Sequence, residues 1–450
     1  MLPTVGVVYT RESAFSREDA QLAQYVALCL AASGRCAKTW LVGLKNDGRS
    51  DEKSTSKSGA VALRCDGAVL DSSKLSSDIY EESGDWKSLE QCDLWLMVVE
   101  ADATLTVSEF LHKKLEKKDE KQPKRVVLSL QTTMRRLAQL NSAYVVICRL
   151  PEAVVLHGGA AFQVIKDEKG MLRPLSNGCF FVERLSKEKT SALYALDVLE
   201  GTGIQVLSRH NIQGKVYEYH VRQNIMFNCL WVVAMKWGCT MLRSFYYINA
   251  LTGKSVLGGL RDRKTRFLFL QALVEMDELF QIVLASVAAA NNKSGRGSGN
   301  SNPDTSAATL FPVRSLMVLL PLPDWIFNGF VLRVFDLGLG APSNKDVSVI
   351  TSDMEANPRL QTTFEAEFRD VFELAAGRDK KLPALKMLQK TILSVRQQYL
   401  QEQKDGISAK TPLRIDSGVL LAEVKLSSHC TAASRTFFLK VFATFVLTLL

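Results

Sequence analysis

The first 44 residues hold the pattern that decides the fold: TVGVVY (residues 4–9), LAQYVALCLAA (residues 22–32) and TWLVGL (residues 39–44). Two short apolar runs on either side of a longer run with helical spacing predict a strand, a helix and a second strand. Similar apolar runs return at residues 94–99 and 125–130. This alternation is typical of an α/β domain with a parallel sheet covered by helices, which we expect over residues 1–185.

From residue 186 onward the sequence changes to long apolar helical segments, with almost no strand signal. The clearest segments are residues 221–237, 264–290 and 384–403. Residues 291–309 form a Gly/Ser/Asn tract that cannot bury a core, so we expect a disordered insertion there. The sequence therefore predicts an all-helical domain over residues 186–425, followed by an apolar tail over residues 426–450.

Composition narrows the class of protein. With 450 residues, 47% of them hydrophobic, the chain is long enough for two cores. Its nine cysteines are scattered without a C-x-x-C pair, which indicates a reducing, intracellular compartment, either cytoplasmic or mitochondrial. The five histidines are too dispersed to predict a metal site. The apolar end, residues 437–450, is interrupted by Lys440 and is shorter than the roughly 20 residues of a spanning helix, so no membrane span is expected.

The net charge of +9 and the pI of about 9.0 suit contact with nucleic acid or an acidic membrane face. Much of the excess lies in the stretch 113–125, where lysines alternate with acids, as on a solvated helix end. The basic stretch RDRKTR (residues 261–266) also contains its own acid, and no aromatic stacking platform is apparent beside it. Direct nucleic-acid binding is therefore the least favoured function.

One helical stretch carries three polar side chains on an otherwise apolar surface. His220, Asn224 and Asn228 are spaced at i, i+4 and i+8, so they share one helix face. Buried polar groups must find hydrogen-bond partners, since each unsatisfied group costs about 1–3 kcal/mol. These three residues therefore either line a pocket or join an internal network between helices.

The same stretch resembles the ketopantoate reductases, whose helix has the spacing Lys-x-x-x-Asn-x-x-x-Asn. Here residues 220–228 read HVRQNIMFN, so both asparagines match and His220 stands at the position of the catalytic lysine. Residues 92–100 (CDLWLMVVE), 126–134 (VVLSLQTTM) and 156–164 (LHGGAAFQV) follow in the family's order. The resemblance implies a Rossmann-like domain and a helical domain similar to the C-terminal domain of 6-phosphogluconate dehydrogenase. It also implies catalytic or substrate roles for His220, Asn224 and Asn228 and pairing through the helical domain.

Departures from the family concentrate at its functional positions. The G-x-G-x-x-G turn that holds the cofactor pyrophosphate is reduced to Gly6, followed by bulky residues. Thr132 stands at a substrate position that the family fills with asparagine, and Glu100 replaces a lysine. The late substrate-binding glutamate corresponds either to Thr363 or, with a short gap, to Glu365. Lys45, after the second strand, is the candidate for the 2′-phosphate of NADPH.

A second motif is discounted. TGKS (residues 252–255) has the ending of a phosphate-binding P-loop, but the earlier glycine of that motif is absent and the segment follows a predicted helix. Ordinary loop chemistry accounts for it.

Two functions remain. The first is a ketopantoate-reductase-like protein that has lost catalysis, needs no cofactor and serves as an interaction or structural subunit with protein partners. The second is an active NADPH-dependent 2-dehydropantoate 2-reductase in which His220 acts as the acid, because its reference pKa of about 6.5 lies near neutrality. Loss of the phosphate cradle favours the first.

Overall fold

The structure is a computed structural model that describes residues 2–11, 16–45, 59–64, 66–99, 106–111, 113, 125–130, 153–162, 164–166, 169–174, 179–184, 189–210, 230–293, 313–333, 360–404 and 415–427. The chain divides into two compact units, Met1–Trp237 and Gly238–Leu450.

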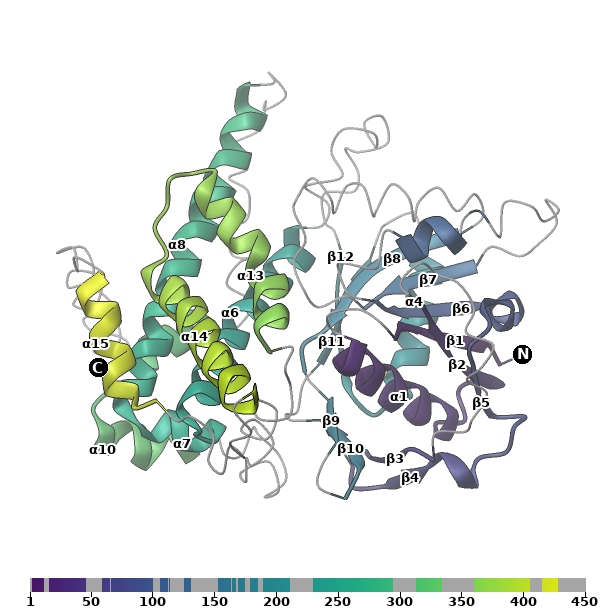
Figure 1. The fold of residues 1–450 in the computed structure, drawn as a ribbon. Coiled ribbons are helices and arrows are strands. Elements are labelled where there is room, and N and C mark those ends of the chain that lie inside the picture. Colours follow the sequence, from purple (N-terminus) through teal and green to yellow (C-terminus); the bar gives the residue numbers. More distant parts are fainter. Residues whose placement is uncertain are drawn as a thin grey trace. The chain divides into compact units, whose positions relative to one another are not determined.

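The first unit is built on a sheet of eight strands in the order β12-β11-β8-β7-β6-β1-β2-β5 (Figure 1). All neighbouring strands from β5 to β8 are parallel, whereas β11 is antiparallel to β8 and carries β12 parallel to itself. The strands are β1 Thr4–Thr10, β2 Lys38–Leu44, β5 Tyr80–Ser83, β6 Leu94–Val98, β7 Arg125–Ser129, β8 Ala153–Ala160, β11 Cys179–Arg184 and β12 Gln205–His210. The predicted strands at residues 4–9, 39–44, 94–99 and 125–130 are confirmed.

Both faces of the sheet are covered, as a parallel sheet requires. Successive side chains of β1 alternate between the faces, so Val7 joins one buried cluster and Val8 the other. The helices α1 (Ser16–Ala32) and α4 (Lys189–Glu200) contribute to the first cluster. The 3-10 helix η2 (Trp86–Gln91) contributes Leu89 to the second.

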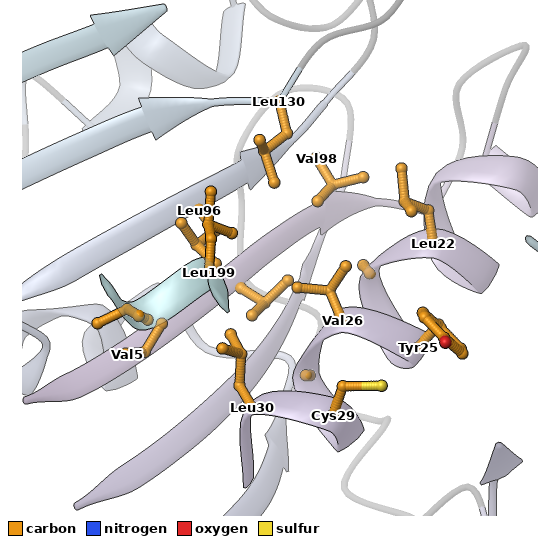
Figure 2. Packing of buried hydrophobic residues seen from close by; sticks show 14 of the residues in the cluster. Val5, Leu22, Tyr25, Val26, Cys29, Leu30, Leu96, Val98, Leu130 and Leu199 are labelled. Carbon is orange, nitrogen blue, oxygen red and sulfur yellow. The ribbon is translucent and has the colours of Figure 1, made fainter. Parts of the chain in front are cut away.

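Helix α1 is buried on two sides, which explains why the predicted stretch 22–32 is almost wholly apolar. Figure 2 shows Leu22, Val26 and Leu30 on the side of α1 that faces the large sheet, whereas Tyr25 and Cys29 point away from it. The other side packs on a second sheet of four strands, in the order β4-β3-β10-β9. Its strands are β3 Val61–Leu63, β4 Val69–Asp71, β9 Val164–Lys166 and β10 Met171–Pro174.

The structure corrects the expectation of almost no strand after residue 186. Strand β12 pairs with β11 along six residues, and α4 connects the two. The large sheet therefore continues well past residue 185, and the two units divide after Trp237. The alternation of β12 was missed because QVLSRH (residues 205–210) is short and half polar.

The second unit is helical within the residues described, as predicted. Helices α8, α13 and α14 pack against one another, and α15 packs on α8 (Figure 1). The helices are α6 Leu230–Thr252, which begins in the first unit, α7 Val256–Arg261, α8 Arg263–Lys293, α9 Val313–Leu319, α10 Asp324–Ile326, the π-helix η5 Phe327–Val331, α13 Leu360–Ala376, α14 Pro383–Lys404 and α15 Ser417–Ser427.

The predicted insertion over residues 291–309 needs one correction, because α8 continues to Lys293. Three residues expected in the loop are thus part of the last turn of this helix. The remaining residues of that segment, and residues 428–450 of the apolar tail, lie outside the described ranges.

The junction between α6, α7 and α8 is held by a helix cap and an ion pair. Gly253, with φ of +64°, ends α6, and the hydroxyl of Ser255 accepts a hydrogen bond from the Gly258 N–H at the start of α7. Lys254 forms an ion pair with Asp262. The TGKS segment therefore follows a helix and serves as a loop with a helix cap, as predicted.

Asp262 accepts hydrogen bonds from three segments of the chain. Besides Lys254, its Oδ2 accepts hydrogen bonds from Thr265 Oγ1 at 2.6 Å and from Ser417 Oγ at 2.5 Å. Burial alone would raise the pKa of Asp262, but these hydrogen bonds outweigh it and hold the pKa well below its ordinary value. Asp262, the acid of the RDRKTR stretch, is thus paired with residues of the protein itself.

Arg266 lies at the centre of this junction and is 0% exposed. Its guanidinium donates to the carbonyls of Leu260, Arg261, Leu320 and Leu322 and to Asp324 Oδ1, at distances of 2.5–3.2 Å. The same group lies over the ring of Phe327, 4.2 Å from its centroid. A buried charge is tolerated only when paired and hydrogen-bonded, and Arg266 satisfies both conditions.

Candidate functional site

The carboxyl ends of the parallel strands define the candidate site in the first unit. In open α/β sheets, ligands bind at this edge, where the loops that follow the strands meet. The register pairs Thr10 of β1 with Leu44 of β2, and Tyr9 with Val98 of β6, so these strand ends are neighbours. Lys45 directly follows β2 and is half-buried.

Bulky side chains occupy the end of β1. The Arg11 N–H donates to the Leu44 carbonyl at 3.0 Å, and its guanidinium lies over the Tyr9 ring, 6.0 Å from the centroid. Both side chains pass over Gly43 of β2, where a Cβ would lie 2.7 Å from the Tyr9 hydroxyl and would collide with Arg11 Nε. Because Gly43 has no side chain, it leaves the space that the Tyr9 and Arg11 side chains occupy.

A tyrosine and glutamate pair continues this cluster on β5. The Tyr80 hydroxyl donates to Glu82 Oε1 at 2.8 Å. Burial raises the pKa of Tyr80, and the Glu82 carboxylate adds to that rise. Burial also raises the pKa of Tyr9, although the Arg11 guanidinium opposes the shift. Burial therefore favours the neutral form of both phenols, and Tyr80 acts as a hydrogen-bond donor.

The pyrophosphate of a dinucleotide needs a close approach to backbone N–H groups, which glycines permit. At the end of β1 the described residues are Tyr9, Thr10 and Arg11, none of which is glycine. The Thr10 hydroxyl is buried and has no hydrogen-bond partner within the ranges that the structure describes. The described part of this edge does not fit a glycine cradle for a dinucleotide.

Gly6, predicted to bind cofactor, lies in the interior of β1 and pairs with Trp40 and Trp95. A Cβ at Gly6 would lie 2.6 Å from Leu89 Cδ2 and 3.1 Å from Cys92 Sγ. Packing against η2 thus accounts for this glycine without a ligand. Gly6 and Lys45 are also apart, because Lys45 lies five positions along the chain from Trp40, the partner of Gly6, or about 16 Å along a strand.

Of the other predicted site residues, Glu365 lies within the described ranges. Glu365 lies on α13 in the second unit and is half-buried. Thr132 and the stripe of His220, Asn224 and Asn228 lie outside the described residues. Their assignment as catalytic and substrate-binding residues therefore stays a prediction.

A buried polar cluster lies two residues away from Glu365. Glu367 is 2% exposed, forms an ion pair with Arg243 of α6, and accepts a hydrogen bond from the Tyr247 hydroxyl at 2.6 Å. Sequence reasoning missed this cluster. In the sequence FEAEF (residues 364–368) both glutamates are candidates, and the signal that selects Glu367 is that it follows Phe364 by three residues on the buried face.

Glu275 of the long helix α8 binds the N-terminus of α14. Its carboxylate accepts hydrogen bonds from the N–H groups of Ala384 and Leu385, at 2.7 and 3.3 Å, in the first turn of α14. Burial raises the pKa of Glu275 to about 8, although these two N–H donors oppose the shift. Its position thus joins α8 to α14.

Neither a metal centre nor a membrane span is found among the residues that the structure describes. No group of three or more His, Cys, Asp or Glu side chains is placed to hold a metal ion. No helix in these ranges combines the length and the apolar character needed to cross a membrane.

The fold defines a class: a two-unit dehydrogenase architecture, with a Rossmann-like sheet unit followed by a helical unit. No protein-family model matches the chain, and no curated protein matches its sequence. The structure is similar to that of a D-mandelate dehydrogenase in ternary complex with NADH and anilino(oxo)acetate, with a TM-score of 0.53 and 9% identity over 88% of this chain and 99% of that one.

Within this class, the fold is that of the ketopantoate reductases. A PanE/ApbA family ketopantoate reductase from Ralstonia eutropha JMP134 matches with a TM-score of 0.50 and 13% identity, again over 88% of this chain and 99% of that one. At these identities the likeness is one of fold. The architecture that the resemblance implies, a Rossmann-like sheet unit followed by a helical unit, is therefore confirmed.

Proposed function

We propose that this chain is a ketopantoate-reductase-like protein that has lost the reductase chemistry and serves as an interaction or structural subunit. The observation that supports the proposal is the end of β1, where Tyr9 and Arg11 fold over Gly43. In a dinucleotide-binding domain this place belongs to glycines and to the phosphate that they approach.

Replacement of that cradle removes more than one contact. Backbone N–H groups and a helix N-terminus together neutralise the pyrophosphate, and a single side chain elsewhere does not reproduce them. Hydride transfer requires a bound nicotinamide, so the chemistry fails with the cofactor site. On this proposal the two asparagines at 224 and 228 have no catalytic role.

Calorimetric titration of the full chain with NADPH tests this proposal, with NADH and ketopantoate as companion ligands. We expect no binding heat up to millimolar cofactor. Dissociation constants in the micromolar range for NADPH would overturn the loss of function. Circular dichroism on the same sample establishes that the protein is folded, so that an absence of heat reports on the site.

The second candidate is an active NADPH-dependent 2-dehydropantoate 2-reductase. Lys45 favours it, because a half-buried lysine immediately after β2 is suitably placed for a 2′-phosphate. If NADPH binds, Lys45→Glu should weaken NADPH more than NADH. A His220→Ala variant should then abolish turnover of ketopantoate while cofactor binding persists, since the imidazole would supply the proton.

The proposed subunit acts through protein partners or a second copy of itself, inside the cell, in the cytoplasm or in mitochondria. The chain's cysteine usage supports this compartment, and its helical unit supplies the pairing surface that the resemblance implies. Equilibrium sedimentation of the purified chain tests self-association directly. A monomer at tens of micromolar would exclude the homodimer.

A further inference from the structure

Two large aromatic side chains at one end of the helical unit are exposed. Trp325 of α10 and Phe330 of η5 are 78% and 72% exposed, the highest values among the large hydrophobic residues that the structure describes. Figure 1 shows α10 at the periphery of the helical unit. Exposed aromatic residues that gather in one place mark interaction sites, whereas single exposed residues do not.

The π-helix brings both aromatic residues to the outer side of the segment. In η5 the N–H of Leu332 donates to the carbonyl of Phe327, five residues earlier, so the helix is wider than an α-helix. Phe327 and Val331 point inward and are buried, whereas Trp325 and Phe330 lie on the opposite, exposed side. π-helical turns are rare and occur frequently at functional sites.

Two contacts with the buried Arg266 hold α10 and η5 in place. Asp324 accepts a hydrogen bond from buried Arg266 at 2.5 Å, and the ring of Phe327 stacks on the same guanidinium. Arg266 also binds the carbonyl of Arg261, so residues 261 and 324 lie at the same place in the fold. The aromatic residues are therefore presented by a fixed backbone next to the start of α8.

Three arginines, on α7, on α8 and after η5, are also exposed. Arg261, Arg263 and Arg333 are exposed and form no ion pair with any residue in the described ranges. The nearby acids are committed to other bases: Asp262 to Lys254, Asp324 to Arg266, and Asp416 to Lys264. We call the set Arg261, Arg263, Trp325, Phe330 and Arg333 the basic aromatic end.

We propose that the basic aromatic end binds the surface of an anionic lipid membrane, with Trp325 and Phe330 inserted at the level of the headgroups. Tryptophan is favoured at this interface because its ring is apolar and its N–H remains hydrated. Arginines beside the aromatic residues attract anionic headgroups. The chain's net charge of +9 strengthens this attraction at long range.

A single-stranded nucleic acid is the main competing ligand, because arginine and aromatic rings also stack on bases. The lipid surface is favoured because the exposed apolar side chains of the helical unit include an aliphatic one. Val419 is 53% exposed and follows Ser417, whose hydroxyl binds Asp262 at the start of α8. Ile326 is half-buried beside Trp325. Neither residue offers a flat ring for a base.

Vesicle co-sedimentation of the full chain tests the proposal. Vesicles of phosphatidylcholine with about 30 mol% phosphatidylserine are compared with pure phosphatidylcholine, at ionic strengths of about 0.1 M and 0.5 M. We expect binding to the anionic vesicles that weakens with salt. Because residues 437–450 are also apolar in sequence, the comparison between variants assigns the binding to the basic aromatic end.

The decisive variants change only exposed side chains. Trp325→Ser with Phe330→Ser should reduce vesicle partitioning at least about tenfold, since two large apolar side chains no longer insert. Arg261→Glu with Arg263→Glu should reduce it by roughly tenfold on anionic vesicles only. Val69→Ser and Lys74→Glu, exposed positions in the first unit, are matched controls that should retain wild-type binding.

Three results would overturn the proposal. They are an absence of binding to anionic vesicles, undiminished binding by the aromatic double variant, and binding of a single-stranded RNA in place of vesicles. The proposal is independent of cofactor binding, so calorimetry with NADPH neither supports nor removes it.

Discussion

Replacement of Arg266 should destabilise the helical unit more than any other change at an arginine of this junction. Its guanidinium makes five hydrogen bonds, four to backbone carbonyls and one to Asp324. In Arg266→Met these acceptors lose their donors, and each buried acceptor without a partner costs about 1–3 kcal/mol. Removal of a buried charge from the interior offsets part of that loss. We therefore expect a net loss of about 3–5 kcal/mol in the free energy of unfolding.

Urea unfolding followed by far-ultraviolet circular dichroism measures this loss. For a unit of this size the slope is about 2–3 kcal/mol per molar urea, so the midpoint of the helical transition should fall by roughly 1.5 M. If the two units unfold in separate transitions, that of the first unit serves as an internal reference. Arg263→Ala, at an exposed position one turn away, should change the free energy of unfolding by no more than about 0.5 kcal/mol.

A midpoint for Arg266→Met within experimental error of wild type would refute the reasoning. It would mean that water satisfies the four carbonyls and that the junction is not closed. Arg266→Lys separates charge from geometry, because lysine keeps the charge but has three donors instead of five. We expect it to recover only part of the lost stability.

Two other predictions concern buried groups. Burial raises the pKa of Glu275 to about 8 in the folded protein, so folding takes up a proton between about pH 4.5 and pH 8 and the stability falls across this window as pH rises, by at most roughly 1.4 kcal/mol per pH unit. Glu275→Gln should flatten that dependence in urea titrations at several pH values, and an unchanged slope would assign it to other groups. Gly6→Ala should destabilise the first unit by about 1–2 kcal/mol, because the new Cβ overlaps the side chains packed from η2. Gly329→Ala, where a Cβ meets nothing within 4 Å, is the control in thermal unfolding, and equal melting temperatures for the two variants would contradict the packing argument.

Prediction succeeded where hydrophobic pattern is sufficient. The strands at residues 4–10 and 38–44 were predicted within one residue of their observed ends, and so was the helix at 383–404. It failed at β12, whose alternation is weak and whose identity as a strand depends on its neighbour β11. Pairing between segments far apart in sequence is a tertiary property, which local pattern does not reveal.

The site was harder to predict than the fold. Gly6 was assigned to a phosphate because glycines are needed there, yet its environment is the side chains of Leu89 and Cys92. Alignment spacing offered Thr363 or Glu365, whereas burial shows that the neighbouring Glu367 is the residue bound to Arg243 and Tyr247. Spacing along the chain identifies candidates, but it does not show which side chains meet.

The sequence by itself determined the α/β unit, the helical unit and the likeness to ketopantoate reductases, because periodicity and a short motif are local properties. Only the tertiary structure decided how charges are used. The stretch RDRKTR, residues 261–266, contains four basic residues and one acidic residue, and the sequence does not show which of them are buried or paired. Folding buries Arg266, pairs Asp262 with Lys254 and leaves Arg261 and Arg263 exposed. The physical reason is that the worth of a charge depends on its burial and its partners, which are set by contacts between distant segments.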